Sequence, residues 1–216
     1  MEIRTVEQSL SRVEKNLASI VERREKLIRQ SRDIISSSSR AIVNIHNGRF
    51  KEAKVELAVA KKLLLSLRKE GTNSLARYLI PPETEVVEAS IVSSIVARNK
   101  LPSITSLGVS SEAYILGLLD SIGEMKRLVL DSIIKGDLRG ATAMFETMEQ
   151  LYSLLSHFAI YDNIVGGTRR KLDVARMLIE DVRGIMAEES RRERLDSTMT
   201  KLLVGLSAAD KQGKPT

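Results

Sequence analysis

The first 47 residues contain neither glycine nor proline, and this composition strongly constrains what the chain can fold into. Hydrophobic residues recur there at the three- and four-residue spacing of a helix face. They are Val6, Leu10, Val13, Leu17, Ile20, Leu27, Ile34, Ile42 and Ile45. The pattern predicts one very long helix, ended by Asn47 and Gly48. A helix of about 40 residues spans about 60 Å, whereas a globule of 216 residues has a radius of gyration of about 17 Å. We therefore expect it to pack partly against other chains.

Turn residues divide the remaining sequence into shorter helices. A second helix is predicted over residues 49–70, with Val55, Val59, Leu63 and Leu67 on one buried stripe. A short helix over 73–80 is expected to end where Pro81 and Pro82 force a break. Further helices are predicted over residues 83–97, 111–135, 138–158 and 168–204, with Asp137 as the N-cap of the third of these.

These segments predict an all-α fold, an antiparallel bundle of about seven helices with very long first and last helices. Aromatic residues make up only 3% of the chain and tryptophan is absent, which argues against an all-β core. We assign residues 1–206 to a single helical domain and residues 207–216 to a polar tail.

Cysteine is absent, which excludes a disulfide framework, a thiolate metal site and a cysteine nucleophile. The N-terminus is charged throughout and does not resemble a signal peptide. There is no run of about 18 apolar residues, the minimum length for a membrane-spanning helix. We therefore expect a cytoplasmic protein that does not insert into membranes.

The net charge of +6 is unevenly distributed. Residues 1–82 hold 17 Lys and Arg against 9 Asp and Glu, a net charge of +8, whereas residues 83–216 hold 17 against 19, a net charge of −2. A basic first part favours a polyanion such as nucleic acid or an acidic membrane surface. A solvated helix surface is the alternative interpretation.

Two acidic pairs lie amid apolar residues where a core stripe is expected. Glu85 and Glu88 share a helix face at a spacing of three residues, and Asp120 and Glu124 do so at a spacing of four. Their mutual repulsion needs solvent, a basic neighbour or a cation to offset it. Carboxylate oxygens suit Mg²⁺ or Mn²⁺, although such pairs are also common on solvated helices. Gly117 and Gly123 flank Asp120 and suggest close approach by a backbone or a ligand.

Four segments resemble the translin superfamily, specifically an archaeal-type form of its Trax (translin-associated factor X) branch. They lie in family order and cover roughly residues 20–190. The most specific is Tyr114-Ile-Leu-Gly-Leu-Leu-Asp-Ser-Ile-Gly-Glu-Met-Lys-Arg127. The supporting segments are Ser31-Arg-Asp-Ile34 followed by Arg40, Ile42 and His46; Glu85-Val-Val-Glu-Ala89; and Arg169-Arg-Lys-Leu-Asp173.

The resemblance implies about seven helices and assembly into a hollow, octamer-like barrel, with relatives or with itself, and we expect a homo-oligomer. It also implies an endoribonuclease that cleaves single-stranded RNA by metal-activated water, with active sites facing the interior. The four acids of Trax correspond to Glu85, Glu88, Asp120 and Glu124, as catalytic residues and as ligands of Mg²⁺ or Mn²⁺. Translin itself binds nucleic acid but lacks the full acidic set, so the catalytic branch is favoured.

Four arginines are candidates for holding the RNA backbone: Arg29, Arg32, Arg40 and Arg127. Surface ion pairs or contacts between subunits are equally consistent with these residues. The scarcity of aromatic residues predicts binding through phosphates rather than through stacked bases. Two other functions stay open, a non-catalytic translin-like scaffold for single-stranded RNA or DNA, and a membrane-surface or regulatory adaptor.

Overall fold

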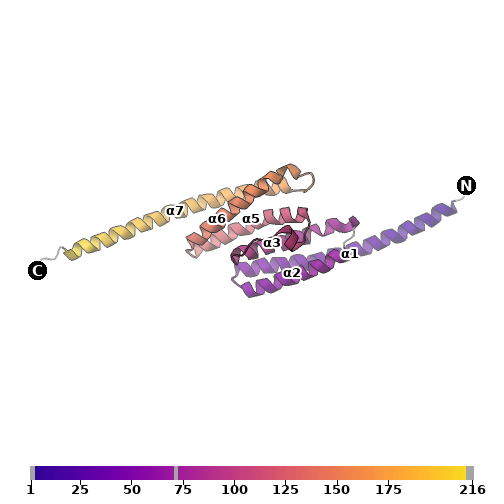
Figure 1. Ribbon diagram of the computed structural model, residues 1–216, viewed down its shortest axis with the longest axis horizontal. Helices are drawn as coiled ribbons and strands as arrows, with labels where there is room; N and C mark the ends of the chain where they lie inside the picture. Colours follow the sequence, from indigo (N-terminus) through magenta and orange to yellow (C-terminus); the bar gives the residue numbers. More distant parts are fainter. Residues whose placement is uncertain (1–2, 71–72, 213–216) are drawn as a thin grey trace. The chain divides into compact units, whose positions relative to one another are not determined.

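The computed structural model describes residues 3–70 and 73–212, with side chains described over 3–69 and 75–206. These residues form helices and no strand (Figure 1). The α-helices are α1 (Arg4–His46), α2 (Phe50–Glu70), α3 (Ile80–Val96), α4 (Ile104–Leu107), α5 (Ser111–Ile134), α6 (Leu138–Ser156) and α7 (Thr168–Gln212). Two 3₁₀ helices are η1 (Asn73–Tyr78) and η2 (His157–Tyr161). The predicted all-α fold with long first and last helices is confirmed.

The chain divides into two compact units. The first comprises Met1–Ser121 and Phe158–Lys171, and the second comprises Ile122–His157 and Leu172–Thr216. The single domain assigned to residues 1–206 stays a prediction. The last helix, predicted to end at residue 204, continues to Gln212. The polar tail assigned to residues 207–216 also stays a prediction, and residues 213–216 lie outside the described residues.

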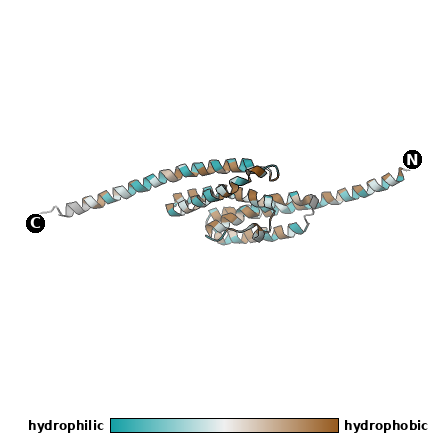
Figure 2. Ribbon diagram, turned by 45° about the horizontal axis from the view of Figure 1, so that its top comes forward, coloured by the Kyte–Doolittle hydropathy of each residue, from teal (hydrophilic) through white to brown (hydrophobic). Residues whose placement is uncertain are grey.

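In the first unit, α1 packs against α2 and α3, and side chains from all three helices meet in a buried hydrophobic cluster. Burial along α1 begins only at Leu27 and continues through Ile34, Ala41 and Ile45. The preceding part of α1 extends beyond α2 and α3 (Figure 1). Its hydrophobic residues Val6, Leu10, Val13 and Leu17 are each more than half exposed. We call these four residues the α1 stripe; Figure 2 shows the hydrophobic residues recurring along this part of the helix.

The stripe predicted to be buried on α2 is wrong for three of its four residues. Val55, Val59 and Leu63 are exposed, and only Leu67 is buried. The buried face is formed instead by Ala53, Leu57, Ala60, Leu64 and Leu67. Apolar residues lie on two faces of this helix, so periodicity alone does not select the face that meets α1 and α3.

The paired prolines begin α3 and do not end the segment before it, so the predicted break is wrong in its position. Pro81 and Pro82 lie in the first turn of α3, and the preceding 3₁₀ helix stops at Tyr78. The first amide groups of a helix have no intrahelical acceptor, so proline costs no hydrogen bond at these positions.

The second unit contains the later part of α5 together with α6 and the rest of α7. Its buried residues include Ile122, Met125, Val129, Met148 and Val182. Asp137 caps α6 as predicted, because its side chain accepts a hydrogen bond from the Gly140 amide at 2.9 Å. Among the described helices, none has the length and apolar character needed to cross a membrane.

Candidate carboxylate site

Glu85 and Glu88 lie one turn apart on α3, at the border of its buried face. The neighbouring Val86, Val87 and Ala89 are almost fully buried, whereas both glutamates are half-buried. The helix thus holds two acids where the core of the first unit meets its surface. This placement matches the predicted face of α3.

Gly117 allows α5 to approach α3 closely. A Cβ atom at this position would lie 2.6 Å from the Thr84 carbonyl oxygen and 2.6 Å from the Val87 Cβ, well inside van der Waals contact. The two helix backbones therefore pass at a separation that only glycine permits. Asp120 follows Gly117 by three residues and lies on the same side of α5, so the contact brings it near the acids of α3.

Glu85, Asp120 and Lys171 form one electrostatic cluster within the first unit. The Lys171 ammonium forms an ion pair with the Asp120 carboxylate. Burial raises the pKa of Glu85 above its ordinary value, and the charge of Asp120 raises this pKa further. The positive charge of Lys171 acts in the opposite direction on the pKa of Glu85.

The sequence does not predict Lys171 as part of this site. It lies at the start of α7, 51 residues after Asp120. The basic run Arg169-Arg170-Lys171 was visible in the sequence, but only the tertiary structure shows which of the three meets an acid. The repulsion between the Glu85 and Asp120 carboxylates is thus offset by a lysine of the same chain.

Glu124 follows Asp120 by one turn of α5 and is half-buried, but it belongs to the second unit. Within the described part of the chain, no three Asp, Glu or His residues are gathered in a way that could hold a metal ion. The donor atoms of Glu85, Glu88 and Asp120 suit a hard divalent cation, while their present arrangement has an ammonium at Asp120. The four-acid metal site stays a prediction.

The second glycine of this segment does not mark a close approach, contrary to expectation. A Cβ atom at Gly123 would lie 3.9 Å from Leu178 Cδ1, an ordinary van der Waals contact. Of the two glycines flanking Asp120, only Gly117 is required by packing.

Three of the predicted RNA-binding arginines share the outer face of α1. Arg29, Arg32 and Arg40 fall within a narrow sector of the helix, opposite the buried residues, and all three are exposed. Arg40 forms a two-pronged ion pair with Glu56 of α2, in which its Nε and Nη2 each lie 3.0 Å from a carboxylate oxygen. Arg127 of α5 is exposed and lies in the second unit.

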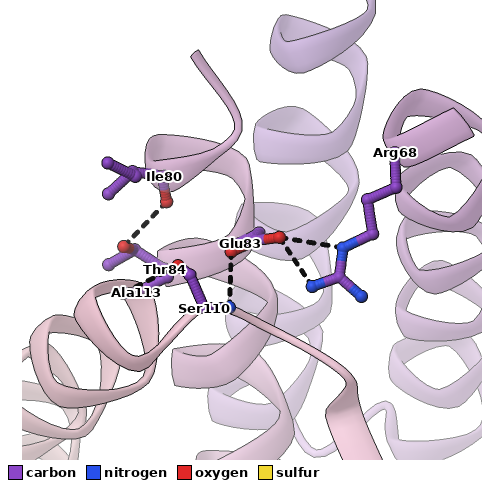
Figure 3. Close-up of polar contacts among 6 residues, drawn as sticks. All are labelled: Arg68, Ile80, Glu83, Thr84, Ser110 and Ala113. Atoms are coloured by element: carbon purple, nitrogen blue, oxygen red, sulfur yellow. Dashed lines mark hydrogen bonds and ion pairs between the residues drawn. The ribbon is translucent and has the colours of Figure 1, made fainter. Parts of the chain in front are cut away.

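A separate buried acid fixes α3 to the elements around it (Figure 3). Glu83 is only 3% exposed. Its Oε1 accepts hydrogen bonds from Arg68 of α2 at 2.8 Å (Nε) and 2.6 Å (Nη2). Its Oε2 accepts one from the Ser110 amide at 2.8 Å, immediately before α5. We call these three residues the Glu83 clamp; it holds α2, α3 and the start of α5 together beside the carboxylate site.

Known proteins are similar to this chain over most of its length. The model of the Translin family matches residues 71–185. An uncharacterized protein of Methanocaldococcus jannaschii is 33% identical over 189 residues, which are 85% of this chain and 84% of that protein.

Solved structures share the fold as well. The crystal structure of AfC3PO is 32% identical, with a TM-score of 0.76, and the match covers 85% of this chain and 98% of the other. The structure of AfC3PO in complex with duplex RNA gives the same TM-score and coverage at 30% identity. The structure of apo-NeC3PO, 22% identical with a TM-score of 0.73 over 82% of this chain and 95% of the other, supports the fold alone.

Proposed function

Because the chain belongs to the translin family, we propose that it binds RNA and cleaves single-stranded RNA as a metal-dependent endoribonuclease. The close passage of α3 and α5 at Gly117, which brings the half-buried Glu85 near Asp120, is the observation that carries this proposal. Hydrolysis of a phosphodiester needs groups that hold a cation and orient water, and paired carboxylates provide them. The complex of AfC3PO with duplex RNA supports RNA as the ligand.

The residues that would hold Mg²⁺ or Mn²⁺ are Glu85, Glu88 and Asp120, whose oxygen donors suit either ion. Glu124 is kept in the set because it follows Asp120 by one turn of the same helix. A bound divalent cation would activate water and neutralise charge on the scissile phosphate.

Other residues around the acids hold the helices that carry them in place. Gly117 keeps α3 and α5 close, so the acids of the two helices lie near one another. The Glu83 clamp fixes the first turn of α3, and the backbone positions of Glu85 and Glu88 directly after it are therefore fixed as well. A site whose groups are held before substrate arrives loses less free energy in ordering them.

One observation favours a second function, a non-catalytic scaffold for single-stranded RNA or DNA. The Lys171 ammonium already neutralises the charge of the Asp120 carboxylate. A scaffold of this kind would bind nucleic acid through phosphates, without cleavage. Arg29, Arg32, Arg40 and Arg127 are the residues we assign to the backbone contacts under either function.

Assembly with copies of the same chain is part of the proposal, as a hollow octamer with the carboxylate sites facing its interior. The α1 stripe supports assembly, since it continues the three- and four-residue spacing of the buried face into an exposed part of the helix. Exposed hydrophobic residues at this spacing are typical of a helix that pairs with another helix. A cytoplasmic location, with which the absence of cysteine is compatible, belongs to the same proposal.

Cleavage of an end-labelled single-stranded RNA, in Mg²⁺ and in EDTA, tests the proposed activity. Asp120→Asn is compared with Asp181→Asn, a matched control because Asp181 also pairs with a lysine, Lys126, but in the second unit. We expect wild type and Asp181→Asn to cleave only with Mg²⁺, and Asp120→Asn to be slower by about a hundredfold or more. Equal cleavage by Asp120→Asn would remove the site assignment, and RNA binding without cleavage by wild type would establish the scaffold.

A further inference from the structure

Lys171 places a positive charge of the chain itself on one of the proposed metal ligands. Its ammonium contacts Oδ1 of Asp120, and the two side chains are 37% and 28% exposed. Both partners are therefore partly withdrawn from water. An ion pair in this setting is screened less by salt than one on the open surface.

A hydrogen-bonded turn, in which Val165 and Thr168 are buried, determines where α7 begins and therefore where Lys171 emerges. Thr168 is fully buried, and its hydroxyl donates to the Val165 carbonyl oxygen at 2.7 Å. The Arg169 amide donates to Oδ1 of Asp162 at 2.9 Å. Because the first turn of α7 is fixed in this way, the backbone of Lys171 has a defined position and only its side chain is free to move.

The Lys171 ammonium and a divalent cation have the same requirement at this site. Each needs the electron pairs of the Asp120 carboxylate, and their like charges repel at close range. The ammonium supplies one positive charge and hydrogen-bond donors, but no coordination positions for other ligands or water. It can therefore stabilise the acids without performing the chemistry of a metal.

We propose that Lys171 is a built-in counter-ion that stabilises the carboxylate site before metal enters, and that it must leave Asp120 when a divalent cation binds. The inference rests on the metal site of the proposed function. It names Lys171 as a residue that competes with the metal: the ion pair and the bound cation exclude each other, so the lysine weakens metal binding.

Calorimetric titration with Mn²⁺, in the absence of RNA, measures this competition. The variants are Lys171→Gln and the matched Lys126→Gln, whose lysine pairs with Asp181 in the second unit. Removing one partly exposed ion pair is expected to make Mn²⁺ binding about two- to fivefold tighter in Lys171→Gln. Lys126→Gln should bind Mn²⁺ as the wild type does, and Lys171→Arg should retain weak binding because it keeps the charge.

A measurement on the wild-type protein avoids any effect of substitution on folding. An amine-reactive reagent labels accessible lysines, and mass spectrometry of peptides gives the extent at each one. Saturating Mn²⁺ should increase labelling of Lys171 and leave Lys126 unchanged.

The outcomes separate this inference from the nuclease proposal. Tighter Mn²⁺ binding by Lys171→Gln with increased labelling of Lys171 supports the competition, even when no RNA is cleaved. Equal or weaker binding by Lys171→Gln overturns it, even when the wild-type protein cleaves RNA. Undetectable Mn²⁺ binding by both proteins also overturns it.

Discussion

The position of a Cβ atom on Gly117 coincides with space that Val87 already occupies, 2.6 Å from the Val87 Cβ. This glycine is the point at which α5 passes α3, one turn before Asp120. A larger residue would force the two helices apart, because the Thr84 carbonyl oxygen and the Val87 Cβ that it would meet both belong to a packed core.

Gly117→Ala is therefore expected to destabilise the protein, by about 1–3 kcal/mol. Gly184→Ala is the matched control, since a Cβ atom at Gly184 meets nothing within 4 Å and alanine is the better helix former. The control should leave stability unchanged or raise it by up to about 1 kcal/mol. Urea unfolding monitored by circular dichroism provides the comparison, and equal stabilities of the two variants would contradict the close contact.

Breaking the Glu83 clamp should cost more than breaking an exposed ion pair. Arg68→Met leaves the Glu83 carboxylate buried without its charged partner, and we expect a loss of about 2–4 kcal/mol in the free energy of unfolding. Arg183→Met removes an arginine that pairs with Glu149 and Glu180 on an exposed surface, where the loss should stay below about 1 kcal/mol. A smaller loss for Arg68→Met than for Arg183→Met would show that the clamp is not a major source of stability.

Lys61 should make stability depend on pH in the alkaline range. Burial lowers the pKa of Lys61 below its ordinary value of 10.5, so the unfolded chain binds this proton more tightly than the folded one. The free energy of unfolding therefore rises with pH between the lowered pKa and 10.5.

Lys61→Met is thus expected to melt at a higher temperature than wild type at pH 7, and the difference should disappear above about pH 11. Lys62→Met, a change at the exposed neighbour, is the control and should show little difference at any pH. Thermal melts across this range provide the measurement. A constant difference between Lys61→Met and wild type at all pH values would contradict the burial effect.

RNA binding through the outer face of α1 should depend on salt in a residue-specific way. Arg29→Ala and Arg32→Ala are each expected to reduce the slope of log affinity against log salt by about 1, the effect of one phosphate contact. Arg40→Ala should reduce it less, because Glu56 already neutralises this guanidinium. Fluorescence anisotropy with a labelled single strand measures the slopes. Unchanged slopes for both Arg29→Ala and Arg32→Ala would remove this face from the RNA site.

Assembly is expected to fail when a charge is placed in the α1 stripe. Leu10→Glu and Leu17→Glu should shift the protein toward smaller species, because a buried unpaired carboxylate disfavours helix pairing. Val43→Glu is the matched control, an exposed valine of the same helix that lies on the arginine face. Sedimentation equilibrium gives the mass of each variant. Assembly that is equally strong in all three variants would exclude the α1 stripe as an interface.

Local sequence signals predict where the helices begin and end, but they predict poorly which helix faces pack against one another. The long glycine-free start, Gly48 and the Asp137 cap mark ends that depend on a few neighbouring residues. The buried face of α2 depends on which of two apolar faces meets α1, and the sequence of α2 contains both. Gly117 and Gly123 look alike in sequence, because the difference lies in what stands opposite.

The site was predictable in the same limited sense. The family pattern identified Glu85 and Asp120 as acids of one cluster, and the structure brings them near one another in the first unit. The sequence pattern does not indicate that Lys171 pairs with Asp120, because 51 residues separate the two. Long-range ion pairs of this kind leave no periodic signature.

The Glu83 clamp also bears on how this part of the molecule can open. One carboxylate is shared by a helix before it in the chain, by its own helix and by an amide 27 residues further on. Movement of only one of these elements would leave the buried carboxylate without one of its partners. Opening of this region therefore costs least free energy when all three elements separate together. The Ser110 amide hydrogen is then expected to exchange with deuterated solvent only when this cooperative unit unfolds. The backbone amides of the nearby Glu85 and Glu88 are expected to be protected to the same degree.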